Sequence, residues 1–267
     1  MLEAVPTACW SNASERNCRT CTSLLPCNIP TRMQDNAGKR PPIISWYTLP
    51  LSILSVSKTS IMKSLESYQT AHAGLFKNET CYIYHYTACN GLRFETIASS
   101  LDECRKARDR WLRSLSVSFT GHRHLSEHTD SLILKLKEEI IRTYQAGKRF
   151  FKTGGAVGFD TLAAEVVLQL KEHLPELALM VIVPFEGQDR YFTPDSKVRY
   201  RRILDQADEV VVLSAAYFQH CYLRRNAYLV NHASRLIAYY DGVGTGGTSY
   251  TVRLAESKQI PVSNLFQ

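Results

Sequence analysis

The most informative segment of this chain is Thr153-Gly154-Gly155-Ala156-Val157-Gly158-Phe159-Asp160-Thr161. It lies between an apolar run at 149–152 and an amphipathic stretch at 162–174. Glycines between a strand and a helix let the backbone turn sharply and bring main-chain N–H groups close to a ligand. The positive end of the following helix points at the same place, which suits an anion such as phosphate. A second glycine cluster, at 242–248, follows another apolar run at 236–240. Two such turns predict a nucleotide or phosphosugar site.

Apolar strands alternate with amphipathic helices from Leu115 to the end of the chain. Strands are predicted at 115–120, from 150, and at 179–184, 210–213, 236–240 and 260–265. Helices are predicted at 126–147, from 162, from Thr193-Pro194-Asp195, and at 221–232 and 249–258. Near-continuous apolar strands between helices indicate a parallel sheet that is covered on both faces. The predicted fold class is therefore α/β, a Rossmann-like doubly wound domain over residues 114–267 with its ligand beyond the carboxyl ends of the strands.

Two segments precede this domain. Residues 1–75 are rich in Ser, Thr, Pro, Asn and Cys and keep no period, so they are predicted to be poorly ordered or loosely attached. Residues 76–113 form a small unit, an N-terminal hairpin-helix extension. Its strands, 81–86 and 92–98, flank an Asn90-Gly91 turn, and Ser100 begins the helix as N-cap with Glu103 at the reciprocal position.

Composition sets loose bounds on the function. The chain has 267 residues and a net charge of +7, spread along the sequence rather than gathered in a basic tail. This charge permits nucleic-acid binding without favouring it over a small anion. The chain does not open like a signal peptide, and Pro50 and Lys58 interrupt the partly apolar stretch at 43–62. The expectation is a cytoplasmic protein that does not enter a membrane.

The cysteines give a weak metal signal. Cys9, Cys18, Cys21 and Cys27 include one C-x-x-C pair, but the second pair lacks the tight spacing of a zinc site. No metal constellation stands out in the main domain. The sequence therefore predicts neither a metal nor a cofactor.

The first five predicted strands of the main domain end in residues typical of a ligand site, mostly glycine or polar ones, and this convergence predicts the site. The predicted ligand-binding residues are Thr120, Gly121, His122, Arg123, Gly154, Gly155, Gly158, Thr161, Pro184, Gln188, Ser214, Arg224, Asn226, Gly246, Gly247 and Thr248.

Each role has a structural alternative. The glycine loop at 154–158 either brings N–H groups to a phosphate or forms a plain strand-to-helix turn. Thr161 either donates its hydroxyl to the phosphate or stabilises the first helical turn. Asp160 is either the helix N-cap or the partner of a ribose hydroxyl. Glu165 is either an acid/base facing a sugar or a solvated side chain. Arg224 lies near a helix start, where a positive side chain opposes the helix dipole, and this hints at an anionic partner.

The ordered motifs resemble one known group of proteins. They are Phe119–Arg123, Gly154–Asp160 with Ala163-Ala164-Glu165, Val183–Phe185 with Gln188, Ala207-Asp208, Arg224–Asn226 and Gly246–Thr251. Together they resemble the YpsA-like group of the SLOG superfamily, which is named from the DprA/Smf and LOG proteins. The resemblance covers about residues 115–267. It implies a nucleotide-like ligand on a Rossmann-type sheet and a ligand-sensing or regulatory role.

The resemblance leaves two alternatives. LOG members release a base from a nucleoside monophosphate with a Gly-Gly-x-Gly-Thr loop followed by a glutamate. Here Thr248-Ser249-Tyr250-Thr251 follow the glycines, and Glu256 lies further along. An N-glycosidic hydrolase acting on a nucleotide would use Glu165 and Asp160 as its catalytic residues. DprA members imply single-stranded DNA binding instead. LOG-like relatives are often dimers, so self-association is expected by analogy alone.

Overall fold

The computed structural model describes residues 64–72, 80–125 and 129–266. Its main domain is built on a six-stranded sheet in the order β7-β6-β5-β4-β8-β9, and all neighbouring strands of this sheet are parallel. The strands are β4 (Ser116–Gly121), β5 (Phe150–Thr153), β6 (Ala178–Val183), β7 (Glu209–Val212), β8 (Arg235–Tyr239) and β9 (Val262–Asn264). The predicted Rossmann-like, doubly wound α/β class is confirmed.

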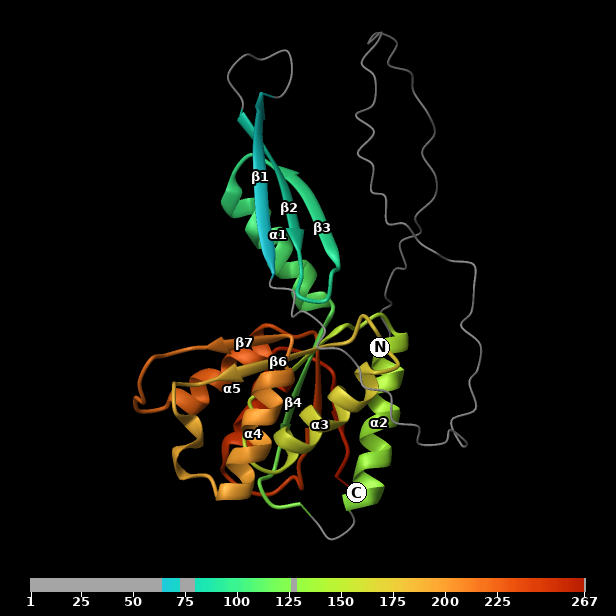
Figure 1. Ribbon diagram of the computed structural model, residues 1–267, viewed down its shortest axis with the longest axis vertical. Helices are drawn as coiled ribbons and strands as arrows, with labels where there is room; N and C mark the ends of the chain where they lie inside the picture. The colour runs from blue at the N-terminus through green and yellow to red at the C-terminus, as the bar shows by residue number, and fades with distance from the viewer. Residues whose placement is uncertain (1–63, 73–79, 126–128, 267) are drawn as a thin grey trace, which may run out of the picture. The chain divides into compact units, whose positions relative to one another are not determined.

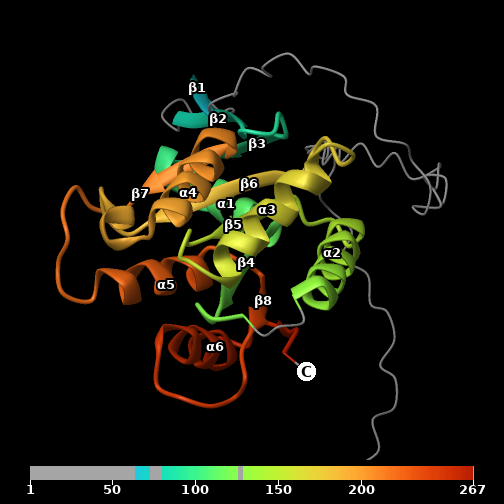
Figure 2. The same cartoon turned by 60° about the horizontal axis from the view of Figure 1, so that its bottom comes forward.

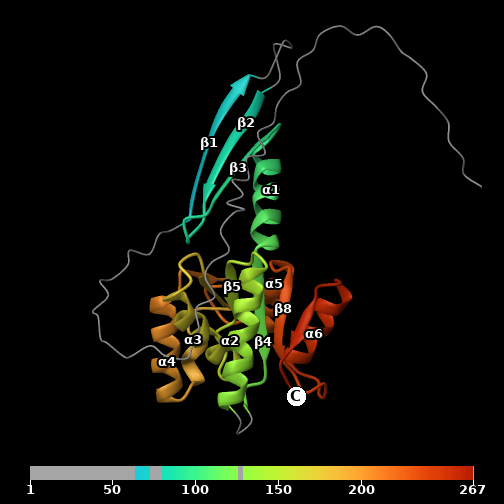
Figure 3. The same cartoon turned by 90° about the vertical axis from the view of Figure 1, so that its right-hand side faces the viewer.

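Helices cover both faces of this sheet (Figures 2 and 3). One face carries α2 (Thr129–Gln145), α3 (Phe159–Lys171) and α4 (Pro194–Gln206), and the other carries α5 (Cys221–Asn231) and α6 (Gly247–Ser257). A short 3-10 helix, η1 (Gln188–Tyr191), precedes α4. The predicted start of α4 is confirmed, since Thr193 is the N-cap and its hydroxyl accepts from the backbone N–H of Ser196.

The main core lies between the sheet and the face that carries α2, α3 and α4. Val117 and Phe119 of β4 and Phe151 of β5 point to this side and are fully buried. Side chains alternate across a strand, so Ser118 and Lys152 point to the face that carries α5. The hydroxyl of Ser118 donates to the Leu229 carbonyl of α5 at 2.8 Å.

The hairpin and helix predicted at 76–113 are confirmed as β2 (Thr80–Thr87), β3 (Arg93–Ala98) and α1 (Leu101–Ser114). The hydroxyl of Ser100 caps α1 by accepting from the Glu103 N–H, as predicted. A capping box also needs a bond from the N-cap N–H to the Glu103 carboxylate, and this part of the prediction is wrong. The Glu103 carboxylate accepts from the hydroxyl of Ser99 instead. Gly91 has a φ of 83° in the turn between β2 and β3, which explains the glycine at this position.

A strand that the sequence pattern did not reveal completes this small sheet. β1 (Leu65–His72) pairs antiparallel with β2 along its whole length, within the segment where no element was predicted (Figure 1). Its side chains do not alternate cleanly between apolar and polar, so periodicity alone could not find it. Trp111 of α1 and Phe150 of β5 meet edge to face, and Asn90 donates to the Glu176 carbonyl. The small unit therefore packs on the main domain through defined contacts.

Candidate functional site

A cavity of about 510 Å³ opens at the carboxyl ends of β4 and β8. Its walls come from the ends of these two strands, from the loop before α3, from α5 and from the start of α6. The cavity is lined by Phe119, Thr120, Gly121, His122, Arg123, Ala156, Asp160, Tyr222, Leu223, Arg225, Asn226, Leu229, Tyr240, Val243, Gly244, Thr245, Gly246, Gly247, Thr248 and Ser249. Both glycine clusters thus contribute residues to one cavity.

The topology explains why the cavity lies here. The chain builds β5, β6 and β7 on one side of β4 and then returns to place β8 on the other side. The loops that leave β4 and β8 therefore diverge to opposite faces and leave a crevice between them. Ligands of open α/β sheets bind at such a switch point, beyond the carboxyl ends of the strands.

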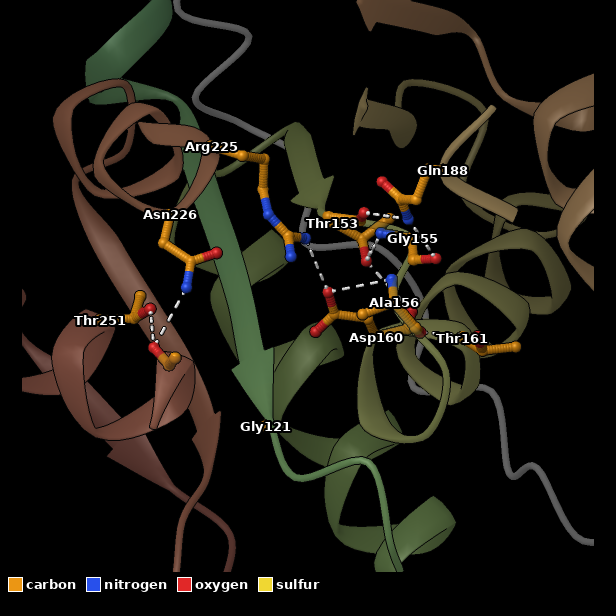
Figure 4. Close-up of polar contacts among 12 residues, drawn as sticks. Gly121, Thr153, Gly155, Ala156, Asp160, Thr161, Gln188, Arg225, Asn226 and Thr251 are labelled. Atoms are coloured by element: carbon orange, nitrogen blue, oxygen red, sulfur yellow. Dashed lines mark hydrogen bonds and ion pairs between the residues drawn. The ribbon is translucent and has the colours of Figure 1, made fainter. Parts of the chain in front are cut away.

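An ion pair between Arg225 and Asp160 forms the buried wall of the cavity (Figure 4). The Nη1 atom of Arg225 lies 3.2 Å from Oδ2 of Asp160, and each side chain is only 7% exposed. Burial raises the pKa of the Asp160 carboxyl, and the Arg225 charge opposes this shift. The Nε atom of Arg225 is buried with no hydrogen-bond partner among the described residues. The Arg225 guanidinium in this wall can therefore donate a further hydrogen bond.

Asp160 does not cap α3, so that part of the sequence prediction is wrong. Gly158 is the N-cap residue, and Asp160 lies within the first turn of the helix. Its carboxylate instead accepts from the N–H of Ala156 at 3.4 Å and pairs with Arg225. The tertiary partner on α5 decides the orientation of Asp160.

Acceptors within the protein already satisfy several N–H groups of the first glycine loop. The N–H of Gly155 donates to the Thr153 hydroxyl, and the N–H of Phe159 donates to the His122 carbonyl at 3.1 Å. Space for a side chain is also lacking. A Cβ atom on Gly154 would lie 1.0 Å from Nη1 of Arg225, and one on Gly158 would lie 2.4 Å from the Arg123 carbonyl. The glycines of this loop therefore make room for Arg225 and for the β4 loop.

The start of α6 is arranged differently. Gly246 is its N-cap residue, and no side chain caps the first turn in the described chain. The Asn226 amide and the Thr251 hydroxyl both donate to the Gly247 carbonyl (Figure 4). The Thr248 hydroxyl donates to the Gly121 carbonyl at 2.9 Å. These bonds hold the turn in place, and Gly246, Gly247, Thr248 and Ser249 of this turn line the cavity. The free N–H groups of a helix start stabilise an anion.

His122 ties the two diverging loops together. Its Nε2 atom lies 3.1 Å from both the backbone nitrogen and Oδ1 of Asp241, and its ring packs against Tyr240. The same Asp241 carboxylate accepts from the Val243 N–H, which lowers its pKa. His122 lines the cavity but serves mainly to hold the β4 and β8 loops in register.

The structure brings many predicted site residues to the cavity and leaves others outside it. Those that line the cavity are Thr120, Gly121, His122, Arg123, Asp160, Asn226, Gly246, Gly247 and Thr248. Those outside its lining are Gly154, Gly155, Gly158, Thr161, Glu165, Pro184, Gln188, Ser214 and Arg224.

Several of the outer residues support the first glycine loop. The Gln188 amide donates to the carbonyls of Gly154 and Gly155, and the Thr161 hydroxyl donates to the Ala156 carbonyl at 2.8 Å. The other outer residues are further removed. Pro184 is buried after β6, Ser214 closes a local turn with Ala216, and Arg224 is exposed.

Glu165 is bound to an arginine of α4. Both of its carboxylate oxygens accept from Arg199, at 3.0 and 2.6 Å. Its side chain is only 17% exposed, so Glu165 is also not the solvated side chain that was the alternative prediction. Because Glu165 lies outside the cavity lining and Asp160 lies within it, the structure does not bring the two predicted catalytic residues together there.

Arg225 lines the cavity and forms its buried ion pair, but the sequence-based prediction did not include it among the site residues. A signal was available, because Cys221, Arg225 and Leu229 recur at the spacing of one helical face, and all three are buried in α5. An arginine within an apolar stripe indicates a buried charge with a tertiary partner. The sequence alone could not identify that partner as Asp160.

The cysteines of the weak zinc signal lie outside the described residues, and no group of three or more potential ligands within the described ranges could hold a metal ion. No helix of the described chain is long and apolar enough to cross a membrane. Cys81, Cys89, Cys104 and Cys221 are free thiols.

A doubly wound sheet with a cavity at its topological switch point defines the class of this chain as a Rossmann-like α/β fold. More specifically, the chain belongs to the YspA SLOG family (YpsA), whose model matches residues 118–263. Membership in this family fits a nucleotide-related binding role.

Curated relatives are similar over the same domain. The chain is 30% identical over 135 residues to the uncharacterized SPbeta prophage-derived protein YoqJ of Bacillus subtilis, covering 43% of this chain and 77% of YoqJ. It is 32% identical over 125 residues to a UPF0398 protein of Halalkalibacterium halodurans, covering 46% of this chain and 66% of the relative. The chain thus spans about two thirds to three quarters of the length of these relatives.

Among solved structures, DNA processing protein A of Helicobacter pylori, described for its single-stranded DNA binding mode, is similar with a TM-score of 0.43 and 18% identity. The match covers 75% of this chain and 81% of that one. The structure of TM1055 is similar with a TM-score of 0.36 and 16% identity, covering 55% and 71% of the two chains. Similarities at this level say nothing of the ligand of this chain.

Proposed function

We propose that this protein binds a nucleotide or nucleotide-derived ligand in the cavity between β4 and β8 and acts as a ligand sensor or regulator. The observation that carries the proposal is the pairing, within one cavity, of an uncapped helix start with a buried arginine whose Nε has no partner in the described chain. A mixed cavity of this size suits a small organic ligand, since such sites fall between about 300 and 1,000 Å³.

The anionic group of the ligand belongs at the start of α6. The first glycine loop is the weaker candidate, because the N–H groups of Gly155, Ala156 and Phe159 already have protein acceptors. The first turn of α6 has no capping side chain. Arg123, exposed on the same cavity, adds a planar donor fork that suits a phosphate.

The sugar belongs beside Asp160 and Arg225. A carboxylate held by a guanidinium is an acceptor for ribose hydroxyls, and the unpartnered Nε is a donor for a ligand oxygen. Asn226 acts indirectly, because its amide positions the Gly247 carbonyl and so the first turn of α6. The site residues of the first glycine loop act as the support for Asp160 and Arg225.

The hydrolase alternative has less support. Glycoside hydrolysis generally uses a pair of carboxylates, yet only Asp160 of the two predicted residues lines the cavity, where it pairs with Arg225. Glu165 is bound to Arg199 outside the cavity. Single-stranded DNA binding rests on the family relationship alone. We therefore expect binding without turnover.

A charge-matched pair of variants tests the proposal. Gly246 has extended backbone geometry, and a Cβ atom there would meet nothing within 4 Å. Asp and Asn are both good N-caps, so Gly246→Asp and Gly246→Asn should each leave the free protein as stable as the wild type or slightly more stable. Only the aspartate places a negative charge where the phosphate would bind.

Thermal shift and calorimetry with AMP, ADP, ADP-ribose, NAD and inorganic phosphate supply the readout. We expect at least one nucleotide to stabilise the wild type and the Asn variant, whereas the Asp variant loses the response. Ligand at a hundred times its Kd stabilises by about 2.7 kcal/mol, which such assays detect. No response from the wild type, or an equal response from the Asp variant, would refute the site. Release of free base would favour the hydrolase, and affinity for an oligonucleotide that falls steeply with salt would favour DNA binding.

A further inference from the structure

A second cavity, of about 300 Å³, lies on the face of the sheet that carries α5. It is enclosed by β5, β6 and β7, by the end of α5, and by α1 and the β2–β3 turn of the small unit. Among the described residues it shares no lining residue with the cavity between β4 and β8. It is therefore a separate space that the proposed nucleotide function does not use.

Lys152 of β5 is the unusual residue of this cavity. A lysine on an inner strand of a sheet is rarely buried without an ion-pair partner. Lys152 is only 5% exposed, and its Nζ donates to the His232 carbonyl at 2.7 Å. An ammonium has three N–H donors, so this one neutral acceptor leaves donor capacity directed at the cavity. Burial lowers the pKa of Lys152 to about 8.

Glu209 of β7 supplies a carboxylate to the same cavity. Within the described chain it forms no ion pair with Lys152, although the charge of Lys152 acts on it and opposes the rise of its pKa caused by burial. Two opposite charges thus line one cavity without touching. A ligand with a negative and a positive end would satisfy both.

The other charged groups of the cavity already have partners. Arg108 pairs with Glu66 and Asp109, and the Nε of Arg113 donates to the Ala233 carbonyl. The His232 ring stacks on Tyr228, with its Nδ1 at 2.9 Å from the Tyr228 carbonyl. Arg113 is exposed to solvent, so Lys152 is the buried cation of this cavity. Glu209 is the carboxylate of the cavity that has no ion-pair partner among the described residues, although the side chains of Ser64 and Cys89 also lower its pKa.

The remaining wall is apolar and aromatic. Phe150, Met180 and Leu112 line the cavity together with the ring of Tyr86. Asp109 and His232 are exposed, so the cavity reaches the surface. A ligand that combines an apolar group with one negative and one positive charge would match this lining.

We propose that this second cavity binds a free α-amino acid with an apolar or aromatic side chain. The carboxylate of the ligand pairs with Lys152, its ammonium group pairs with Glu209, and its side chain packs on Phe150, Met180 and Leu112. The proposal is independent of the nucleotide site, because it rests on different residues.

Calorimetry and thermal shift with the full-length protein and the free amino acids test this proposal. Two half-ligands complete the panel: 3-phenylpropionate lacks the ammonium group, and 2-phenylethylamine lacks the carboxylate. We expect an apolar amino acid to bind and each half-ligand to bind at least about tenfold more weakly, since one charged hydrogen bond is lost. Failure of every amino acid to bind at millimolar concentration would overturn the proposal, and so would equal binding of a half-ligand.

Lys152→Met and Glu209→Gln are the diagnostic variants. Methionine matches the lysine stem and removes a buried charge, and glutamine keeps the shape of the glutamate, so both variants should fold. Each should weaken amino-acid binding at least about tenfold while any nucleotide response of the wild type is unchanged. Gly246→Asp should show the opposite pattern and keep amino-acid binding. If Lys152→Met bound amino acids with unchanged affinity, the second cavity would not be the amino-acid site.

Discussion

At the scale of single residues, burial separates two neighbouring arginines of α5. Arg225 lies 3.2 Å from Asp160 in the core of the site, whereas Arg224 is exposed with its guanidinium over the Phe218 ring. Removing one partner of a buried ion pair leaves the other charge uncompensated.

Arg225→Met should therefore lower the free energy of unfolding by about 3–5 kcal/mol. The adjacent Arg224→Met is the matched control and should stay within about 0.5 kcal/mol of the wild type, because surface substitutions cost little. Urea denaturation measures both values. A similar small change in both variants would mean that the Arg225–Asp160 pair does not stabilise the fold.

At the scale of elements, the start of α1 distinguishes two neighbouring serines. The Ser100 hydroxyl accepts from the Glu103 N–H and satisfies one of the free donors of the first turn. The Ser99 hydroxyl only donates to the exposed Glu103 carboxylate. The helix should depend on the first bond far more than on the second.

Ser100→Ala should destabilise the protein by about 1 kcal/mol, as the loss of an N-cap usually does. Ser99→Ala should lower the free energy of unfolding by no more than a few tenths of a kcal/mol, because the hydrogen bond from Ser99 to Glu103 is exposed to water, which weakens it. Chemical denaturation monitored by circular dichroism compares the two. Equal losses would show that the cap does not limit the stability of α1.

At the scale of the whole molecule, Lys152 links stability to pH. Its pKa falls from the ordinary 10.5 to about 8 in the folded protein because the ammonium is buried. Between these pH values the unfolded chain binds the proton and the folded chain does not. The contribution of Lys152 to the free energy of unfolding therefore increases as the pH rises from about 8 to 10.5, and it is constant below this range.

Lys152→Met should abolish this contribution. Relative to the variant, the wild type should gain about 3 kcal/mol between pH 7 and pH 10.5, at about 1.36 kcal/mol for each pKa unit. Denaturation of both proteins across this range gives the difference, in which other titrating groups cancel. A difference that does not change with pH would place the Lys152 amine in contact with water.

Most elements of the main domain and of the small unit were readable from the sequence because each signal is local. Apolar runs, the Thr193-Pro194 helix start and the Asn90-Gly91 turn act through neighbouring residues, and the structure contains each of them. The strand β1 was missed because its pairing with β2 is a contact between segments, and its own residues carry no clear alternation.

Local patterns of residues are sufficient to predict the alternation of strands and helices, the doubly wound class and the edge of the sheet where glycines gather. The tertiary structure alone decided how those glycines are used. It joined Arg225 to Asp160 across 65 residues, supplied acceptors to the first glycine loop and left the start of α6 uncapped. The physical reason is that turns and periodicity arise from local backbone preferences, whereas a buried charge or an unsatisfied donor is defined by neighbours that only the folded chain brings together.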